Sequence, residues 1–345
     1  MAFRRFPHPA PRRAKPRILP VFTPRAGCAG TCIFCAQEHQ TGRTGAARSG
    51  LEASYAEMLR DLGAIRPGQP VELAFYGGTF TALPEAWRAR FLQAAADFRS
   101  RGLVSAVRCS TRPDACDPVL LARLKGMGLD TVELGVQSFD GAVLHLARRG
   151  HTGEDALKAC EAARGAGLGL AIQLLPGLPG HTPEMFERDI ALCVQAAPDM
   201  ARLHPCLVLA GTGLEALWRR GEFTPWSLDA TVDALSPAVL ALWRSGIAVT
   251  RIGLAPEPSL DEAVLAGPRH PALGTMVRAG ALLADIRQGL AGRRAVSLAA
   301  PQRLSGEFWG HARSLAGDYA ALGLDSDAVR FEDRDDFLLE VLHDE

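Results

Sequence analysis

Three cysteines near the N-terminus have the residue type and the spacing for metal chemistry. Cys28, Cys32 and Cys35 form a C-x3-C-x2-C pattern within the segment PRAGCAGTCIFCAQ. Three thiolates suit a four-iron cluster that keeps one iron free for a substrate or cofactor, whereas clusters that only carry electrons normally have four cysteine ligands. Structural zinc sites usually combine two C-x2-C units, and the other cysteines here stand alone. The spacing therefore favours a three-cysteine cluster over zinc or scattered core thiols.

Length and composition limit the class of protein. A chain of 345 residues with 48% hydrophobic residues suffices for one large α/β domain and a small appendage. Lys+Arg and Asp+Glu both number 38, so bulk charge predicts no nucleic-acid partner, although a local basic patch can still provide one. No run of 18 apolar residues is present to span a membrane, and isolated cysteines fit a reducing compartment. We expect a cytoplasmic protein with no membrane segment and no secretory signal.

The first residues of the chain combine basic side chains with prolines. Such a composition favours a disordered, solvated tail over residues 1–16, with an RNA-contacting arm as the alternative. The basic residues of this region are Arg4, Arg5, Arg12, Arg13, Lys15 and Arg17.

Short apolar runs alternate with longer amphipathic stretches through the middle of the chain. The expected strands are Ile18–Phe22, Val71–Tyr76, Ala106–Ser110, Thr131–Val136, Gly169–Leu174, Arg202–Leu209 and Ile247–Gly253. This β-α alternation predicts a parallel sheet with helices outside it, which right-handed crossovers wind into an open or partial barrel. In such folds the chemistry lies on the loops at the carboxyl ends of the strands. The cysteine loop follows the first expected strand and therefore lies where this fold is expected to place its chemistry.

Beyond about residue 255 the pattern changes. Residues 255–275 look like loop, and the apolar helix Met276–Gln288 comes next. A compact α/β cap is expected after it, with no GXXG loop of the kind that an RNA-binding KH module uses. Its elements are the strands Ala295–Leu298, Ala328–Phe331 and Phe337–Leu342 and the helix Ser305–Gly323. The expected division is a tail (1–16), a barrel domain (17–254) and a C-terminal extension (255–345).

With Phe34 directly before Cys35, the cysteine pattern resembles the signature of the radical S-adenosylmethionine (SAM) superfamily. The resemblance implies a partial (β/α)6 TIM-type barrel and a [4Fe-4S] cluster on Cys28, Cys32 and Cys35. It also implies that SAM binds the open iron and is reductively cleaved to a 5′-deoxyadenosyl radical. Phe34 would lie beside the adenine, and an external donor such as flavodoxin or ferredoxin would supply the electron.

Polar or glycine-rich segments recur after successive expected strands. Each segment alone is compatible with ordinary turns, but their regular recurrence agrees with the SAM site that the resemblance implies. The residues expected to position SAM are Phe34, Gly77, Gly78, Thr79, Ser110, Arg112, Gln137 and Gln173. The Gly-Gly-Thr form at 77–79, in place of the commoner Gly-Gly-Glu, is similar to the subgroup related to the Elongator catalytic subunit.

Further segments support the same subgroup, and the resemblance covers roughly residues 17–290. They are RRGHT at 148–152, residues 204–214 and residues 267–271. For the arginines at 148 and 149, surface charge is an equally good interpretation. The last 55 or so residues are too short for the acetyltransferase domain of the Elongator subunit, so acetyl transfer is not implied.

The expected activity is hydrogen abstraction from a substrate over the barrel mouth. Gln137 and His270 are the candidates for a catalytic role, His270 because it lies between two prolines in a loop. The resemblance implies tRNA or a nucleoside as the substrate. A small metabolite or a porphyrin-type substrate is the rival, and a non-catalytic iron–sulfur or SAM-binding protein is the alternative outside the enzyme class.

Overall fold

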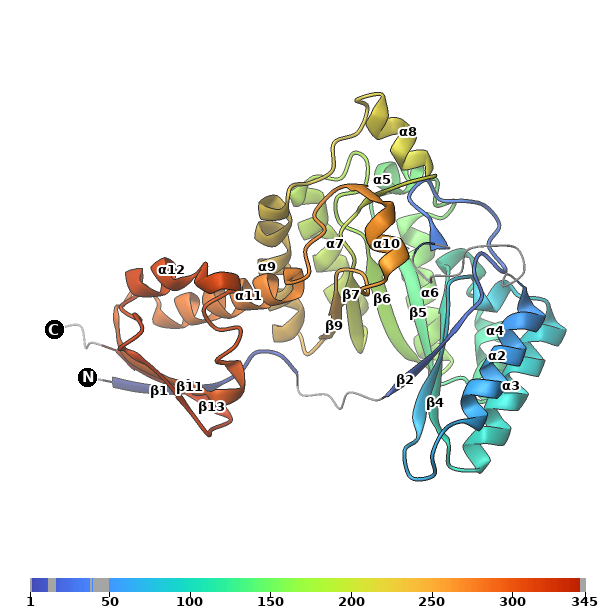
Figure 1. Ribbon diagram of the computed structural model, residues 1–345, viewed down its shortest axis with the longest axis horizontal. Coiled ribbons are helices and arrows are strands. Elements are labelled where there is room, and N and C mark those ends of the chain that lie inside the picture. The colour runs from blue at the N-terminus through green and yellow to red at the C-terminus, as the bar shows by residue number, and fades with distance from the viewer. Residues whose placement is uncertain (1, 12–16, 38, 40–49, 342–345) are drawn as a thin grey trace.

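The computed structural model describes residues 2–11, 17–37, 39 and 50–341. They form a curled parallel sheet covered by helices and, beside it, a smaller sheet with its own helices (Figure 1). No helix in these ranges is both long enough and apolar enough to cross a bilayer.

The larger sheet has seven parallel strands in the order β2-β3-β4-β5-β6-β7-β9. They are β2 (Ile18–Phe22), β3 (Val71–Tyr76), β4 (Val104–Thr111), β5 (Thr131–Gln137), β6 (Gly169–Leu174), β7 (Met200–Leu203) and β9 (Ala248–Ile252). The predicted α/β partial barrel is confirmed, and β9 adds a seventh strand to the six that the resemblance implied. Because neighbouring strands run parallel, their carboxyl ends meet at one edge of the sheet.

Helices pack against the outer face of this half-barrel (Figure 1). They are α2 (Leu51–Gly63), α3 (Glu85–Ser100), α4 (Pro118–Gly126), α6 (Gly153–Gly165), α7 (Pro183–Ala196) and α9 (Leu228–Arg244). The short α5 (Gly141–Leu146) instead packs with Ile33 of the cysteine loop at the carboxyl end of the sheet. The start of α7 follows from its sequence: the Thr182 hydroxyl accepts a hydrogen bond from the Met185 N–H at 3.3 Å, and Pro183 occupies the first turn.

The two faces of the strands differ in polarity, which determines where the site lies. In β5, Val132, Leu134 and Val136 belong to the buried core under the helices. Glu133 and Gln137 alternate with them and face the interior of the half-barrel. Since successive side chains of a strand point to opposite faces, the same alternation places polar residues of several strands around one interior space.

Two connections differ from the expectation. The single strand expected at Arg202–Leu209 is split into β7 and β8 (Val208–Leu209), since Pro205 cannot donate a ladder hydrogen bond. Part of the loop expected at 255–275 forms α10 (Pro258–Ala263) and β10 (Val264–Ala266), which pairs antiparallel with β8. Leu260 of α10 is buried in a small apolar cluster, a tertiary contact that the local pattern did not indicate. The helix α8 (Gly213–Arg219) lies between β8 and α9 in the chain.

The smaller sheet has the order β1-β13-β11-β12. Its elements are β1 (Ala2–Pro7), β11 (Ala295–Pro301), β12 (Val329–Glu332) and β13 (Asp336–Val341), with α11 (Leu273–Leu290) and α12 (Ala316–Ala321) beside them. Its core contains Phe308, Tyr319 and Phe337, and α11 packs against α9 of the half-barrel. The single helix expected over Ser305–Gly323 is wrong: Gly310 has a φ of 75°, and only the short α12 forms near the end of this segment.

The interpretation of residues 1–16 as a disordered tail is wrong for residues 2–7. They form β1, which pairs antiparallel with β13 from Ala2 opposite Val341 to Pro7 opposite Asp336. The Phe6 ring stacks on Phe337 with centroids 5.1 Å apart. The basic composition concealed this strand, because its partner lies at the other end of the chain. Arg12, Arg13 and Lys15 lie outside the described residues.

Candidate functional site

A cavity of about 470 Å³ opens at the carboxyl ends of the parallel strands. It brings together every residue predicted to bind metal or SAM. These are Cys28, Cys32, Phe34, Cys35, Gly77, Gly78, Thr79, Ser110, Arg112, Gln137 and Gln173. The grouping follows from the parallel sheet, since loops after successive strands end at one edge.

The cysteine loop is held against the end of β3 by backbone hydrogen bonds. The Arg25 N–H donates to the Gly77 carbonyl at 2.7 Å, and the Thr79 N–H donates to the Ala26 carbonyl at 2.8 Å. The loop crosses directly over Gly78, where an added Cβ would lie 2.6 Å from the Thr23 carbonyl oxygen. The glycine at 78 therefore allows two backbones to approach each other, a role beyond the ligand contact expected of it.

The three thiols have different polar surroundings. The Cys28 Sγ lies 3.3 Å from the Thr79 hydroxyl. The buried Cys32 Sγ accepts a hydrogen bond from the Arg149 guanidinium at 3.1 Å, with a second guanidinium, that of Arg112, at 4.0 Å. Burial, and after it the neighbouring Cys32, raises the pKa of the Cys35 thiol to about 11. The Cys32 sulfur therefore lies next to two cationic donors, whereas the Cys35 sulfur lies in a region shielded from solvent.

Arg149 was missed as a site residue, and its interpretation as surface charge is wrong. Its side chain is buried, with Nη1 on Cys32 and Nη2 on the Gly135 carbonyl. Its own carbonyl accepts a hydrogen bond from Arg112, whose guanidinium also forms two 2.9 Å bonds with Asp114. Arg148, by contrast, is exposed. The RRGHT segment was the available signal, but the sequence did not indicate which arginine turns inward.

Gln137 presents an unused acceptor to the cavity. It ends β5 with a φ of 71°, a left-handed conformation that is uncommon for a residue other than glycine, at a shift in the β5–β6 register. Its side chain is buried, and its Oε1 has no hydrogen-bond partner within the described part of the chain. A buried acceptor without a partner is costly, so this atom is suited to a ligand that donates.

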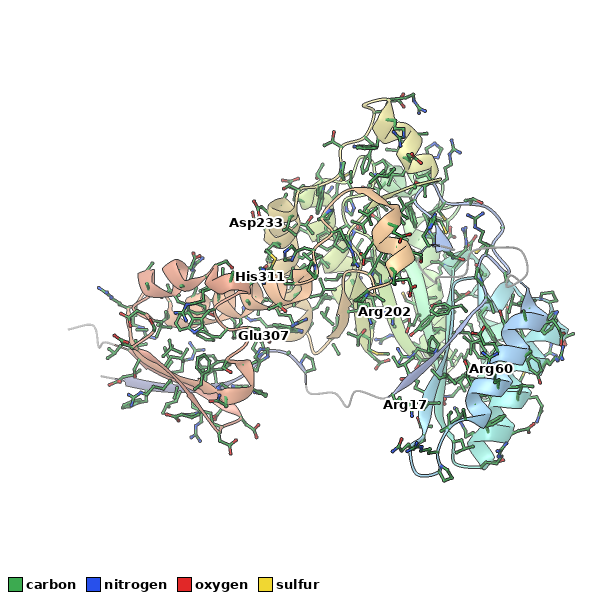
Figure 2. All side chains as sticks on the ribbon, viewed as in Figure 1. Arg17, Arg60, Arg202, Asp233, Glu307 and His311 are labelled. Atoms are coloured by element: carbon green, nitrogen blue, oxygen red, sulfur yellow. The ribbon has the colours of Figure 1, made fainter. Side chains whose placement is uncertain are left out.

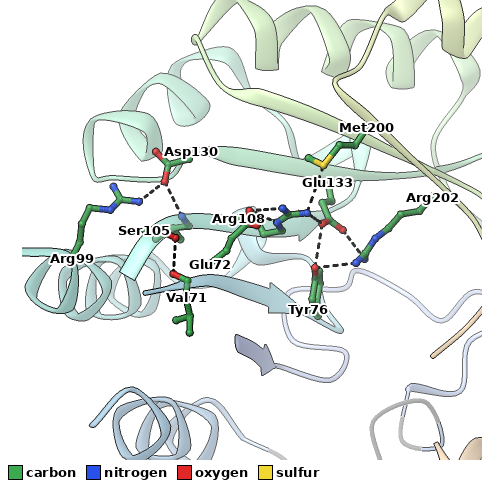
Figure 3. A network of polar contacts seen from close by, with 11 residues as sticks. Val71, Glu72, Tyr76, Arg99, Ser105, Arg108, Asp130, Glu133, Met200 and Arg202 are labelled. Atoms are coloured by element: carbon green, nitrogen blue, oxygen red, sulfur yellow. Dashed lines mark hydrogen bonds and ion pairs between the residues drawn. The ribbon is translucent and has the colours of Figure 1, made fainter. Parts of the chain in front are cut away.

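The interior of the half-barrel holds a buried ion cluster that sequence reasoning missed (Figure 3). The Arg108 Nε donates to Glu72 at 2.6 Å, and its Nη1 donates to Glu133 at 2.8 Å. Glu133 also accepts from Arg202 at 2.8 Å and from the Tyr76 hydroxyl at 3.3 Å. Burial, and after it the Glu133 charge, raises the pKa of Tyr76 to about 12, so the phenol stays neutral. Tyr76, Glu133 and Arg202 line the cavity.

His204 and Arg251 extend this polar wall. The His204 Nδ1 lies 2.9 Å from the Gly253 carbonyl, which can only accept, so Nδ1 carries the proton. Burial, and after it the Arg202 charge, lowers the pKa of His204 to about 3. The imidazole is therefore neutral near pH 7 and its Nε2 is an acceptor. Arg251 lies beside Arg202 across the β7–β9 pairing.

His270, the second candidate for a catalytic role, is not among the residues that line the cavity. Its ring lies against the ring of His311, with centroids 5.0 Å apart, and its Nδ1 accepts from the Ala272 N–H at 3.1 Å. Figure 2 shows Arg202 in the interior of the half-barrel and His311 outside it, near the smaller sheet. The geometry gives His270 a place in a loop contact rather than at the cavity.

The donors around the cavity fit a cluster of several irons with a bound nucleoside ligand. No three His, Cys, Asp or Glu side chains of the described residues converge on a point where a single metal ion would bind. A four-iron cluster does not require its ligands to converge on one point, since each thiolate binds its own iron. The guanidinium on the Cys32 sulfur places positive charge beside a candidate ligand, and the free Gln137 acceptor suits a hydroxyl or N–H of a ligand.

Sequence comparison places the fold and site in a known class. The profile described as "Radical SAM superfamily" matches residues 23–193, and the profile described as "Radical_SAM C-terminal domain" matches residues 198–281. The chain belongs to the radical SAM superfamily, a family of enzymes that bind a [4Fe-4S] cluster and SAM.

Individual relatives refine the comparison. A tRNA uridine(34) acetyltransferase of Methanocaldococcus infernus is 32% identical over 64% of this chain and 48% of its own length. Elongator complex protein 3 of Danio rerio is 32% identical over 67% of this chain and 46% of its own length. The solved structure of Elp3 from M. infernus matches with a TM-score of 0.59 at 25% identity, over 80% of this chain and 64% of that one. The chain thus spans about half the length of the curated relatives.

Proposed function

We propose that the chain is a radical SAM enzyme that abstracts a hydrogen atom from a uridine-type nucleoside of tRNA. Archaeal relatives named as tRNA uridine(34) acetyltransferases support this substrate class. Because the chain spans about half of those relatives, the proposal covers the radical step and not the transfer of an acetyl group. It includes a cytoplasmic location, where tRNA is available.

In this proposal Cys28, Cys32 and Cys35 hold the [4Fe-4S] cluster. When bound, the cluster and SAM supply a 5′-deoxyadenosyl radical after an electron arrives from a flavodoxin or ferredoxin. The residues of the chain hold and orient the ligands and keep water away from them. Those assigned to SAM are Phe34, Gly77, Gly78, Thr79, Ser110, Arg112, Gln137 and Gln173.

One observation carries the proposal. Three thiols and the unpartnered acceptor of buried Gln137 line the same cavity, although the thiols come from the loop after β2 and Gln137 ends β5. A purely structural metal site has no need of an unsatisfied acceptor beside it, whereas a site that binds a nucleoside cofactor does.

The test is anaerobic reconstitution with iron and sulfide, followed by SAM and dithionite with and without tRNA. We expect 5′-deoxyadenosine in amounts that rise when tRNA is added. Cys32→Ser abolishes it. Cys116→Ser, which changes a cysteine outside the cavity lining, does not.

The other outcomes of this test identify the alternatives. A stimulation by a small metabolite or a porphyrin instead of tRNA replaces the substrate class but keeps the chemistry. A chain that binds cluster and SAM yet yields no 5′-deoxyadenosine with any candidate substrate is a binding protein, and the proposal fails. The likeness to coproporphyrinogen III oxidase of Escherichia coli, with a TM-score of 0.51 at 23% identity, concerns the fold alone.

A further inference from the structure

Two arginines are neighbours on the last two strands of the larger sheet. The cysteine loop follows β2, the first strand in the spatial order, whereas Arg202 and Arg251 are paired neighbours on β7 and β9, the last two. Both side chains line the cavity. Like charges on neighbouring strands repel each other, so this arrangement favours a negative charge nearby.

The buried ion cluster supplies too little negative charge. Glu72 and Glu133 pair with Arg108 and Arg202, and Arg251 is a third cation at the same cavity. Glu72 binds Arg108, and Glu133 binds both Arg108 and Arg202, so both carboxylates are in use. These five side chains together therefore carry one net positive charge.

Arg251 is the cation of this group that has no carboxylate partner. Its side chain is exposed at the cavity lining and forms no hydrogen bond or ion pair with any residue in the described ranges. Loss of hydration beside the cavity wall, and after it the Arg202 charge, lowers the pKa of the Arg251 guanidinium, although the side chain stays exposed. Arg202 has its own unused donor, since its buried Nε has no partner among the described residues. Both arginines thus have N–H groups free for an anion.

His204 adds an acceptor next to these donors. It is the second residue after Arg202, on the same face of the chain, and its neutral ring leaves Nε2 unprotonated. An apolar wall made by Leu207, Leu209, Leu254 and Leu260 completes this side of the cavity. The surroundings therefore suit a ligand with an anionic oxygen group and an adjacent donor on an otherwise apolar body.

We propose that Arg202, Arg251 and His204 form an anchoring subsite that holds a phosphate or carboxylate group of the molecule to be modified. The inference rests on the proposed function, because it assigns the substrate of the same cavity. It divides the lining of one cavity between the cysteine loop for the cofactors and the β7–β9 side for an anionic part of the substrate, two parts that meet where Ala36 packs with Leu207, Leu209 and Leu260. Guanidinium groups suit both kinds of anion through paired N–H donors.

The test measures equilibrium binding to the reconstituted holoprotein with saturating SAM and no reductant. The probes are uridine, uridine 5′-monophosphate and succinate. We expect the phosphate ester to bind at least about tenfold more tightly than uridine, the worth of a hydrogen bond to a charged group. Arg251→Gln brings this ratio close to one, and Arg251→Lys keeps part of it. Arg188→Gln, which removes the same charge from an exposed position on α7, leaves the ratio unchanged.

The outcomes separate the sources of the anion. Succinate binding that depends on Arg251, without a preference for the phosphate ester, assigns the subsite to a small carboxylate. If neither probe depends on Arg251, the proposal is overturned. It is also overturned if Arg251→Gln weakens the binding of SAM, because the anion is then the cofactor's own. A failure to cleave SAM refutes the proposed function instead, and the binding ratio can be measured independently of cleavage.

Discussion

Replacing Gly78 by alanine tests whether the fold positions the cysteine loop through backbone contact. An added Cβ would lie 2.5 Å from the Ala26 carbonyl oxygen and 2.6 Å from that of Thr23, whereas ordinary contacts begin at 3.4 Å. Subtracting 2.5 Å from 3.4 Å leaves a retreat of about 0.9 Å for the loop. Both obstructing atoms are backbone, so no side-chain rotation relieves the overlap. Overpacking of this kind costs about 1–3 kcal/mol.

The same displacement moves Cys28, whose N–H bonds to the Arg25 carbonyl within the loop. A misplacement of about 1 Å can reduce a rate about 100-fold, so we expect Gly78→Ala to lower the yield of 5′-deoxyadenosine by one to two orders of magnitude. Gly30→Ala is the matched control, because Gly30 lies in the same loop with no atom within 4 Å of an added Cβ.

The assay compares the iron and sulfide content of both reconstituted variants, then the rate of SAM cleavage. The reasoning is refuted if Gly78→Ala assembles its cluster and cleaves SAM like the unaltered chain. An equal loss of SAM cleavage in both variants also counts against it. The loop would then tolerate no added side chain, and the backbone contact over β3 would not be the cause.

Three further predictions concern other parts of the molecule. Arg149→Met removes a cationic donor from the Cys32 sulfur and should make the iron–sulfur cluster harder to reduce. Its reduction potential should fall by about 60 mV, for a differential stabilisation of about 1.4 kcal/mol. An EPR-monitored redox titration measures this potential, and an unchanged value would limit Arg149 to packing. Phe6→Ala should lower the free energy of unfolding by about 2 kcal/mol, because Phe6 stacks on Phe337. Phe3 is 66% exposed on the same strand, so Phe3→Ala should change the free energy of unfolding little. Urea titration of both variants checks the difference, and equal effects would contradict the placement of β1. Burial, and after it Arg303, lowers the pKa of His8 from 6.5 to about 4, so the unfolded chain binds the extra proton between these values and stability falls as the pH drops through this window. His8→Phe should reduce the slope of unfolding free energy against pH near pH 5 by about one proton, and an unchanged slope would show that His8 is not the group that titrates.

The strands of the half-barrel were predictable because their information is local. β2, β3 and β6 occupy the expected residues, since each is a short apolar run bounded by other residue types. The cavity residues were predictable for a topological reason: parallel strands bring their carboxyl ends together, so polar segments that follow them meet.

The charged interior was not predictable, because it depends on partners far apart in the chain. Glu133 pairs with Arg108 and with Arg202, which are 25 and 69 residues away. Lys, Arg, Asp and Glu are mostly exposed unless paired, and a single sequence does not show the pairing. β1 was missed for the same reason, since Ala2 pairs with Val341.

The buried ion cluster has a cost that its position helps to explain. Burying charged pairs is often no better for stability than apolar packing of the same volume, and β7 already carries apolar residues on its outer face. What the cluster contributes instead is order: Glu133 fixes Arg202 through a 2.8 Å bond, and Arg202 in turn lies over the Tyr76 ring at 5.0 Å. An anion that enters the cavity therefore meets donors that are already oriented, and little side-chain entropy is lost when it binds. Replacing the buried ion cluster by apolar side chains would keep the interior of the barrel filled. It would also remove the oriented Arg202 that, in our proposal, binds the anion together with Arg251.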